Sequence, residues 1–157
     1  MDLVIGATAT LAILALAVIY GTDVASAVVQ RPVYAELDDR ILVQVTGRGH
    51  YYGDRRFPVV GISGTVLTAA TAGLSLLWGT AVTAVLSVVA LLLLLVWLTL
   101  FARISAPINK VLTAAALADE VPTDARALQA RWESIIPLRG VLLGLAILLL
   151  CATILLG

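Results

Sequence analysis

Four long apolar stretches constrain the fold of this chain more than any other feature. Each approaches or exceeds the roughly 20 residues that an α-helix needs to cross the hydrocarbon core of a bilayer, and none contains an acidic residue. They are Leu3–Gly21, Val59–Trp78, Ala81–Ala102 and Ile135–Leu156. With 61% hydrophobic residues and a mean hydropathy of +1.06, the composition is typical of a polytopic membrane protein. We therefore predict an all-α fold: a single domain over residues 1–157, forming an integral membrane four-helix bundle with interfacial amphipathic helices on one side.

Charge and cysteine content exclude several classes of function. Ten basic residues balance ten acidic ones, so no excess positive charge indicates a nucleic-acid partner. The single cysteine, Cys151, cannot form an internal disulfide. The chain has one histidine, His50, and no Cys/His spacing suited to zinc. We expect neither nucleic acid nor a metal, and the absence of GxGxxG, P-loop, HExxH and paired-histidine motifs gives no support to dinucleotide, ATP or haem cofactors.

The basic residues predict the orientation of the four spans. We interpret the first stretch as a span and not a signal peptide, because only Asp2 precedes it and no clean AxA-like cleavage site follows. The segments at about 22–58 and 103–134 carry most of the arginines, whereas the turn "WGTA" between the second and third spans has none. The positive-inside rule then makes both segments cytoplasmic. We expect a multi-pass protein of the cell membrane with both termini outside.

The first polar segment begins with a predicted amphipathic helix. Apolar residues recur at helical spacing after Pro32, and Glu36 and Arg40 form an i,i+4 pair on another face, with Gly47 as a stop signal. The apolar positions are Tyr34, Leu37, Ile41 and Val45. This helix is expected at the membrane interface, either as a solvated linker covering the bundle end or as a lid over a substrate cavity.

The stretch "GRGHYYGDRRFP", Gly47 to Pro58, collects polar chemistry in one place. Its three glycines and one proline predict a turn leading into the second span. In one interpretation the patch anchors the membrane border, because aromatic rings and arginines favour that position; those residues are Tyr51, Tyr52, Phe57, Arg48, Arg55 and Arg56. In the other, His50 is a general base near neutral pH, oriented by Asp54 or Glu36.

The second polar segment predicts two helices joined by the turn "DEVPTD". Ser105 and Pro107 favour the start of a short helix, and Thr123 is a plausible N-cap for a longer one that continues through Trp132 into the last span. Pro137 is expected to kink this helix. Trp132 and Arg139 are seven residues apart and share a face. They are either an interfacial anchor with a snorkelling arginine, or an aromatic wall and a cation that holds an oxyanion.

Two motifs carry a family resemblance. "PINKVL" (Pro107 to Leu112), followed after an acidic linker by "RWESIIPLR" (Arg131 to Arg139), resembles the C-terminal signature of a small four-span membrane family that includes the anthrone oxygenases of aromatic polyketide biosynthesis. The layout is similar too: a first span, a long polar loop, two closely joined spans and a last span after the Asn and Trp motifs. Members of that family carry a histidine between the Trp and the Arg, where this chain has Ile135 and Ile136. His50 is then the only imidazole available.

The resemblance implies an oxidoreductase or cyclase that acts on a lipophilic aromatic, polyketide-like substrate without a bound redox cofactor. Such chemistry needs an apolar cavity, a base and a cation beside the enolate oxygen. The implied catalytic residues are His50 as base, Arg139 as enolate partner and Asn109 as positioner, with Arg56 as a second candidate for the enolate. Tyr51, Tyr52 and Trp132 would form walls, and Glu36 completes the expected substrate-binding set. Both polar segments are expected to meet over one pocket.

A non-enzymatic role is the alternative, as a membrane accessory subunit or a small-molecule-binding protein. Glycines in the second and fourth spans allow helices to approach closely, within the bundle or between copies in a homo-oligomer; they are Gly61, Gly64, Gly73, Gly140 and Gly144. A transporter is not favoured, because the spans lack acidic residues and the chain has no internal repeat.

The orientation is tested by labelling a cysteine placed at Thr80, in the turn between the second and third spans. In a Cys151→Ser background, we expect a membrane-impermeant maleimide to modify this cysteine in intact cells, because the turn lies outside. Modification from the cytoplasm only would contradict the orientation.

Overall fold

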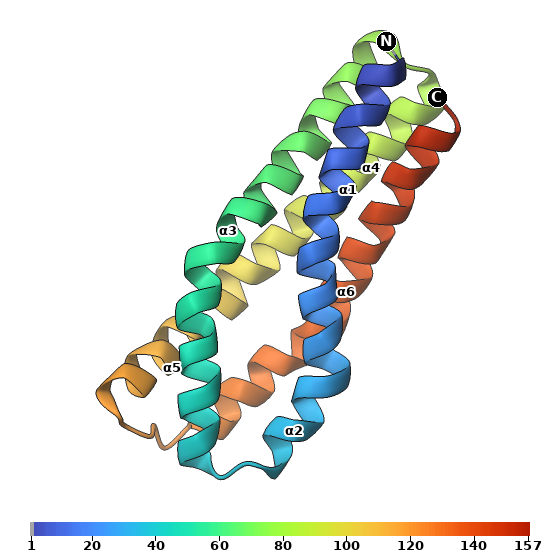
Figure 1. The fold of residues 1–157 in the computed structure, drawn as a ribbon. Coiled ribbons are helices and arrows are strands. Elements are labelled where there is room, and N and C mark those ends of the chain that lie inside the picture. The colour runs from blue at the N-terminus through green and yellow to red at the C-terminus, as the bar shows by residue number, and fades with distance from the viewer. Residues whose placement is uncertain (1) are drawn as a thin grey trace.

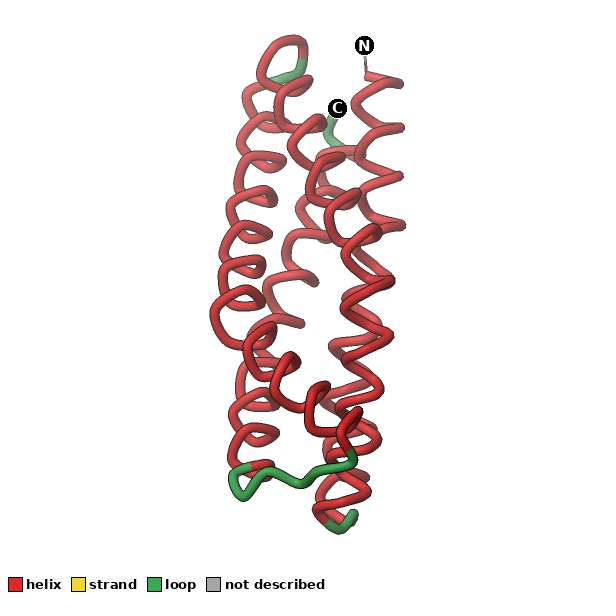
Figure 2. Tube along the Cα trace, turned by 90° about the vertical axis from the view of Figure 1, so that its left-hand side faces the viewer, coloured by secondary structure: helices red, strands yellow, loops and turns green. Residues whose placement is uncertain are grey.

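The computed structural model describes residues 2–157, and every regular element in this range is helical. Four helical rods are long and apolar enough to cross a membrane, as the sequence predicts: Asp2–Glu36, Asp39–Trp78, Ala81–Ala118 and Ala125–Leu155. The connecting loops lie at the two ends of the molecule (Figure 2). The chain is therefore an all-helical bundle of four candidate transmembrane helices.

The four rods close into a ring. Helix α1 (Asp2–Ala25) packs against α3 (Asp39–Trp78) and α6 (Ala125–Leu155), and α4 (Ala81–Leu100) packs against the same two helices. Both termini lie at the same end as the α3–α4 turn, and the other loops lie at the opposite end (Figure 1). This layout places the two polar segments together, as the predicted topology requires.

The two halves of the bundle have separate apolar cores. In the half near the termini, small and branched side chains of α1, α4 and α6 pack together, among them Ala9, Ala12, Leu94 and Leu143. Large apolar side chains cover the outside of this half, with Leu148 64% exposed, as expected of a surface that faces lipid. In the other half a smaller cluster joins α3 to α5 (Ala106–Ala118) and the start of α6.

Two π-helical segments bend the rods where the two halves meet. Helix α1 continues through η1 (Ser26–Gln30) into α2 (Arg31–Glu36), and α4 continues through η2 (Phe101–Ser105) into α5. In each case the residue after the segment donates its N–H five residues back, Arg31 to Ser26 and Ala106 to Phe101. Pro32 and Pro107 follow directly. Because proline lacks an N–H and its ring clashes with the carbonyl four residues earlier, the wider turn fits the chain around it.

The predicted turn at Gly47–Pro58 is wrong. This stretch lies inside α3, and the helix passes through Gly47 and Pro58 without a break. Side-chain pairs at i,i+4 spacing support it: Arg48 donates to Gln44 at 3.0 Å, and the guanidinium of Arg55 lies 3.5 Å from the ring centroid of Tyr51. Such pairs stabilise a helix, and glycines tolerate helical dihedrals when packing favours them.

Other predicted boundaries shift by a few residues. The amphipathic helix after Pro32 breaks at Leu37 and restarts at Asp39, where the Asp38 side chain accepts from the Ile41 N–H at 2.9 Å. The predicted short helix is present as α5. Helix α6 begins at Ala125 with Asp124 as its N-cap, so the prediction of Thr123 as the cap is wrong. As predicted, α6 is continuous from the polar segment through Trp132 into the last span.

Gly47 is required where α3 crosses α5. A Cβ atom at this position would lie 2.2 Å from the Leu112 carbonyl oxygen and 2.5 Å from the Ala116 Cβ. The Thr113 hydroxyl donates to the Gly47 carbonyl at 3.1 Å in the same contact. The two backbones therefore touch here, and α5 is held against α3.

Substitution of Gly47 tests this contact. Gly47→Ala should reduce the free energy of unfolding in detergent by about 1–3 kcal/mol, because the added methyl overpacks a backbone contact. Gly49→Ala is the matched control on the same helix, since nothing lies within 4 Å of its Cβ position; it should be neutral or stabilising by up to about 1 kcal/mol through helix propensity. Equal effects of the two changes would contradict the packing.

Candidate functional site

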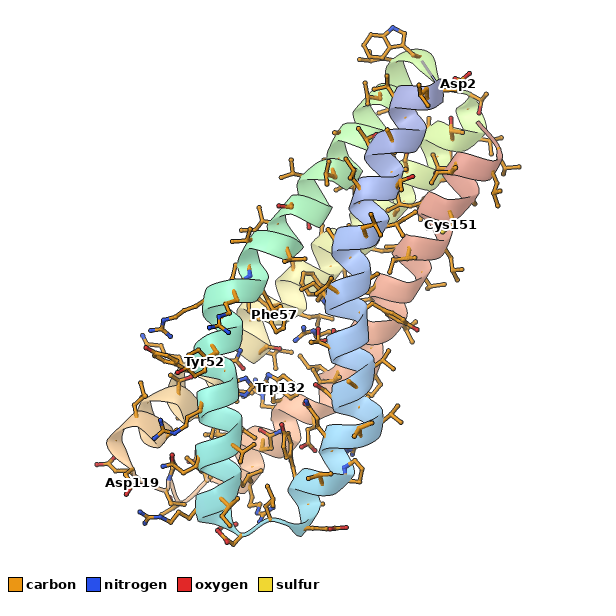
Figure 3. All side chains as sticks on the ribbon, viewed as in Figure 1. Asp2, Tyr52, Phe57, Asp119, Trp132 and Cys151 are labelled. Carbon is orange, nitrogen blue, oxygen red and sulfur yellow. The ribbon has the colours of Figure 1, made fainter. Side chains whose placement is uncertain are left out.

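A cavity of about 380 Å³ lies where the apolar and polar halves of the bundle meet. All four rods contribute to it, and Phe57 and Trp132 extend into the space between the helices in this region (Figure 3). Its lining residues are Ile19, Thr22, Asp23, Ser26, Gln30, Tyr34, Thr46, Gly49, His50, Gly53, Asp54, Phe57, Pro58, Gly61, Ile62, Trp97, Leu98, Phe101, Asn109, Gln129, Trp132 and Arg139. Residues of both predicted polar segments therefore meet at one cavity.

A buried ion pair joins α1 to α6 at this cavity. Arg139 Nη2 lies 3.0 Å from Asp23 Oδ1, and both side chains are only 6% exposed. Arg139 Nη1 also donates to the Ser105 hydroxyl of η2 at 2.8 Å. Both terminal nitrogens of the guanidinium are thereby fixed, and its charge is balanced by a carboxylate.

Aromatic rings surround the same guanidinium. Its central carbon lies 5.4 Å from the Trp97 ring centroid and 5.6 Å from that of Phe101, and these two rings are nearly parallel. Trp97 Nε1 is 3.5 Å from Asp23 Oδ2. Cation–π contacts strengthen as water is removed, so the aromatic residues of α4 and η2 help to hold Arg139 in place.

Two further carboxylates orient amide side chains of the cavity wall. Asn109 Nδ2 of α5 donates to both oxygens of Asp54 on α3, at 2.9 and 3.2 Å. Gln129 Nε2 of α6 donates to Glu133 Oε1 at 2.9 Å, and Glu133 Oε2 is 3.5 Å from Arg31 Nε. An ionised carboxylate can only accept hydrogen bonds. Each one therefore binds the NH2 group of its amide, and the amide oxygen is left without a partner.

His50 and Trp132 form a further part of the wall. Their ring centroids are 5.2 Å apart at an interplanar angle of 51°, which brings α3 and α6 together. The two carboxylates that the sequence offered to orient His50 are engaged elsewhere or lie elsewhere: Asp54 accepts from Asn109 on another helix, and Glu36 is not among the residues that line the cavity. The neighbour that His50 does contact is the Trp132 ring.

Several buried polar atoms at this cavity have no hydrogen-bond partner, which is unusual. Six buried side-chain polar atoms find no hydrogen-bond partner among residues 2–157, and five of them belong to residues that line the cavity. These five, called the open atoms below, are His50 Nε2, Asn109 Oδ1, Gln129 Oε1, Trp132 Nε1 and Arg139 Nε. Buried polar atoms are normally paired, so five open atoms at one cavity indicate a place for a polar ligand or for water.

Of the eight residues expected in the catalytic and substrate-binding set, four line the cavity: His50, Asn109, Trp132 and Arg139. The other four, Glu36, Tyr51, Tyr52 and Arg56, are not among the lining residues in the described chain. Tyr52 is 54% exposed, packs edge-on against Tyr51 and has the Arg56 guanidinium 5.1 Å from its ring centroid. These aromatic residues and arginines form an outer face of α3.

Sequence reasoning missed Asp23, Gln129 and Trp97. The signal for Asp23 was its isolation: it follows the first predicted span by two residues and is the only acidic residue between Asp2 and Glu36. A charge at that depth needs a partner, and Arg139 is the one basic residue inside a predicted span. Gln129 and Trp97 carried no comparable signal, because an amide on a helix and a tryptophan near the end of a span are both common.

Comparisons of the chain with protein-family models, with curated proteins and with solved structures gave no match. The function is therefore argued from the cavity.

A double-mutant cycle tests whether Asp23 and Arg139 form one unit. Asp23→Asn should reduce the free energy of unfolding by about 3–5 kcal/mol, because it leaves a buried cation without its partner. Arg139→Gln should be costly for the mirror reason, whereas the double variant should lose less than the sum, since neither charge remains. Unfolding in detergent measures all three, and strictly additive losses would contradict the pairing.

Proposed function

We propose that the protein is a small integral membrane enzyme that takes up a lipophilic aromatic molecule and removes a proton from it. The observation that supports this most directly is the set of open atoms around a partly apolar cavity. Its volume lies within the range of about 300–1,000 Å³ typical of small-molecule sites. The aromatic rings of Tyr34, Phe57, Trp97, Phe101 and Trp132 suit a flat, unsaturated ligand.

The open atoms supply both kinds of hydrogen-bonding group. Trp132 Nε1 and Arg139 Nε can only donate, whereas Asn109 Oδ1 and Gln129 Oε1 accept. His50 Nε2 accepts when the ring is neutral with its proton on Nδ1. A ligand with a carbonyl and more than one hydroxyl group on an aromatic frame supplies both the acceptors and the donors that these atoms need.

The same atoms suit a reaction that begins with proton abstraction. In an anthrone-like substrate the carbon opposite the carbonyl is acidic, because its carbanion is an enolate whose charge rests on the carbonyl oxygen. His50 Nε2 would take that proton. Arg139 Nε would donate to the oxygen as it becomes negative, already oriented by the bonds to Asp23 and Ser105. Asn109 Oδ1 and Gln129 Oε1 would fix the ring hydroxyls.

Oxygenation of the enolate needs no oxidant other than dioxygen. The carbanion passes one electron to dioxygen, and the two radicals combine into a peroxide anion at the same carbon. This anion takes back the proton held by His50 and becomes a hydroperoxide. Loss of water then gives the quinone: one anthrone and one dioxygen become one anthraquinone and one water. The same proton abstraction could instead start a cyclisation, which consumes no oxygen. The sequence motifs similar to those of the anthrone oxygenases support the oxygenation.

We also propose that the cavity lies at the cytoplasmic border of the membrane, with both termini outside. Phe57 and Ile62 line the cavity and are 40% and 59% exposed, on the part of α3 where the apolar span begins. A lipophilic substrate dissolved in the bilayer would reach the cavity beside these side chains. The polar ends of α2 and α5 would then lie near the lipid headgroups.

His50 is tested by activity on anthrone. Protein in nanodiscs should accelerate oxygen uptake and anthraquinone formation above the rate with empty nanodiscs. His50→Ala should lower the rate about 10²–10⁴-fold through loss of the general base, and Arg139→Ala about 10²–10³-fold through loss of one oxyanion donor.

Arg48→Gln is the control for this experiment. Arg48 lies two residues before His50 on α3, is exposed and does not belong to the cavity wall in residues 2–157. Full activity of His50→Ala would exclude His50 as the base. Binding of anthrone to the cavity with no turnover would leave a small-molecule-binding protein.

A further inference from the structure

We infer that Asp23 sets the charge class of the ligand, so that the cavity selects uncharged aromatic molecules and rejects carboxylates. This inference rests on the proposed function only in taking the cavity as the ligand site. It concerns recognition and not the reaction.

An arginine in an apolar cavity would by itself attract an anionic ligand, because guanidinium and carboxylate geometries match. Here the guanidinium already has hydrogen-bond partners within the chain. Arg139 Nη2 donates to Asp23 Oδ1 at 3.0 Å, and Nη1 donates to the Ser105 hydroxyl at 2.8 Å. Nε is the guanidinium nitrogen without a partner, and Nη1 and Nη2 each keep one of their two N–H groups. What Asp23 removes is therefore the unbalanced positive charge that would attract a second carboxylate.

The charges of the wall point the same way. Of the two aspartates and one arginine that line the cavity, Asp54 is exposed to solvent, so the charge that a ligand beside Arg139 meets first is that of Asp23. A carboxylate ligand beside Arg139 would lie close to Asp23, in a place where water screens little because both side chains are 6% exposed. Repulsion from Asp23 then offsets the attraction of Arg139.

A cationic ligand is disfavoured by the two donors among the open atoms, whereas the three acceptors do not act against it. Trp132 Nε1 and Arg139 Nε are donors, and a cation without acceptor atoms would leave both unpaired and would lie beside the guanidinium. An uncharged molecule with adjacent acceptor and donor groups pairs them. The cavity therefore suits phenols, alcohols and ketones.

Three probes with one ring system test this. They are 9-anthracenemethanol, 9-anthracenecarboxylate and the trimethylammonium derivative of 9-methylanthracene, which are uncharged, anionic and cationic at neutral pH. Binding is followed by anthracene fluorescence, with the protein in phosphatidylcholine nanodiscs and empty nanodiscs as the correction for partition into lipid. The native protein should bind the alcohol at least tenfold more tightly than either charged probe.

Variants of the ion pair identify Asp23 as the cause. Asp23→Asn leaves Arg139 unbalanced and should lower the alcohol-to-carboxylate preference tenfold or more. Asp23→Asn combined with Arg139→Gln removes the cation as well and should restore the preference for the alcohol. Ser105→Ala frees an N–H of Arg139 but removes no charge, so it should change the ratio far less than Asp23→Asn does.

Several outcomes would overturn the inference: a native protein that binds the carboxylate or the cation as tightly as the alcohol, one that binds none of the three, or an unchanged ratio in Asp23→Asn. The first two need only the native protein, so they decide the question even where Asp23→Asn fails to fold. None of the probes undergoes the proposed oxygenation. Charge selection without turnover of anthrone would leave this inference standing and remove the catalytic proposal, and turnover without charge selection would do the reverse.

Discussion

The arrangement of this bundle depends on the ion pair between Asp23 and Arg139. It joins the first and last long helices, Ser105 ties η2 to it, and Trp97 and Phe101 pack around it. Two buried charges are stable only together. The pair therefore fixes how α1, α4 and α6 meet below their apolar halves, and this junction forms one wall of the cavity.

Much of the fold could be predicted from the sequence because its strongest signals are long stretches of uniform composition, which do not depend on any single residue. Four apolar stretches and two polar segments were enough to give the four rods and to place the polar ends together. The course of α3 was not predictable from turn propensity, since its glycines and Pro58 argue for a break. Contacts with α5 decide the outcome there: Gly47 is small because the Leu112 backbone lies against it.

The site shows a similar division. Composition marked His50 as the sole imidazole, and the spacing of Trp132 and Arg139 placed them on one face; Asn109 came from a motif. These residues meet because α5 folds back on α3. The sequence did not indicate which carboxylate holds which side chain: Asp23 pairs with Arg139, and Asp54 accepts from Asn109. A partner of this kind is defined by a distance between helices, which no local pattern encodes.

The two π-helical segments have a consequence for the length of the chain. A π-turn holds about one residue more than an α-turn, and each residue turns an α-helix by about 100°. The extra residue is therefore absorbed in the wider turn, and the helices before and after it keep the angular register of an uninterrupted α-helix. Loss of a single residue from Ser26–Gln30 would let the turn relax to α-helical geometry and would leave Tyr34 on the face that lines the cavity. A deletion in the α-helical part of the same rod has no wide turn to absorb it and would rotate the residues that follow by about 100°. The two π-helical segments are thus the places in these rods where loss of one residue should be tolerated best.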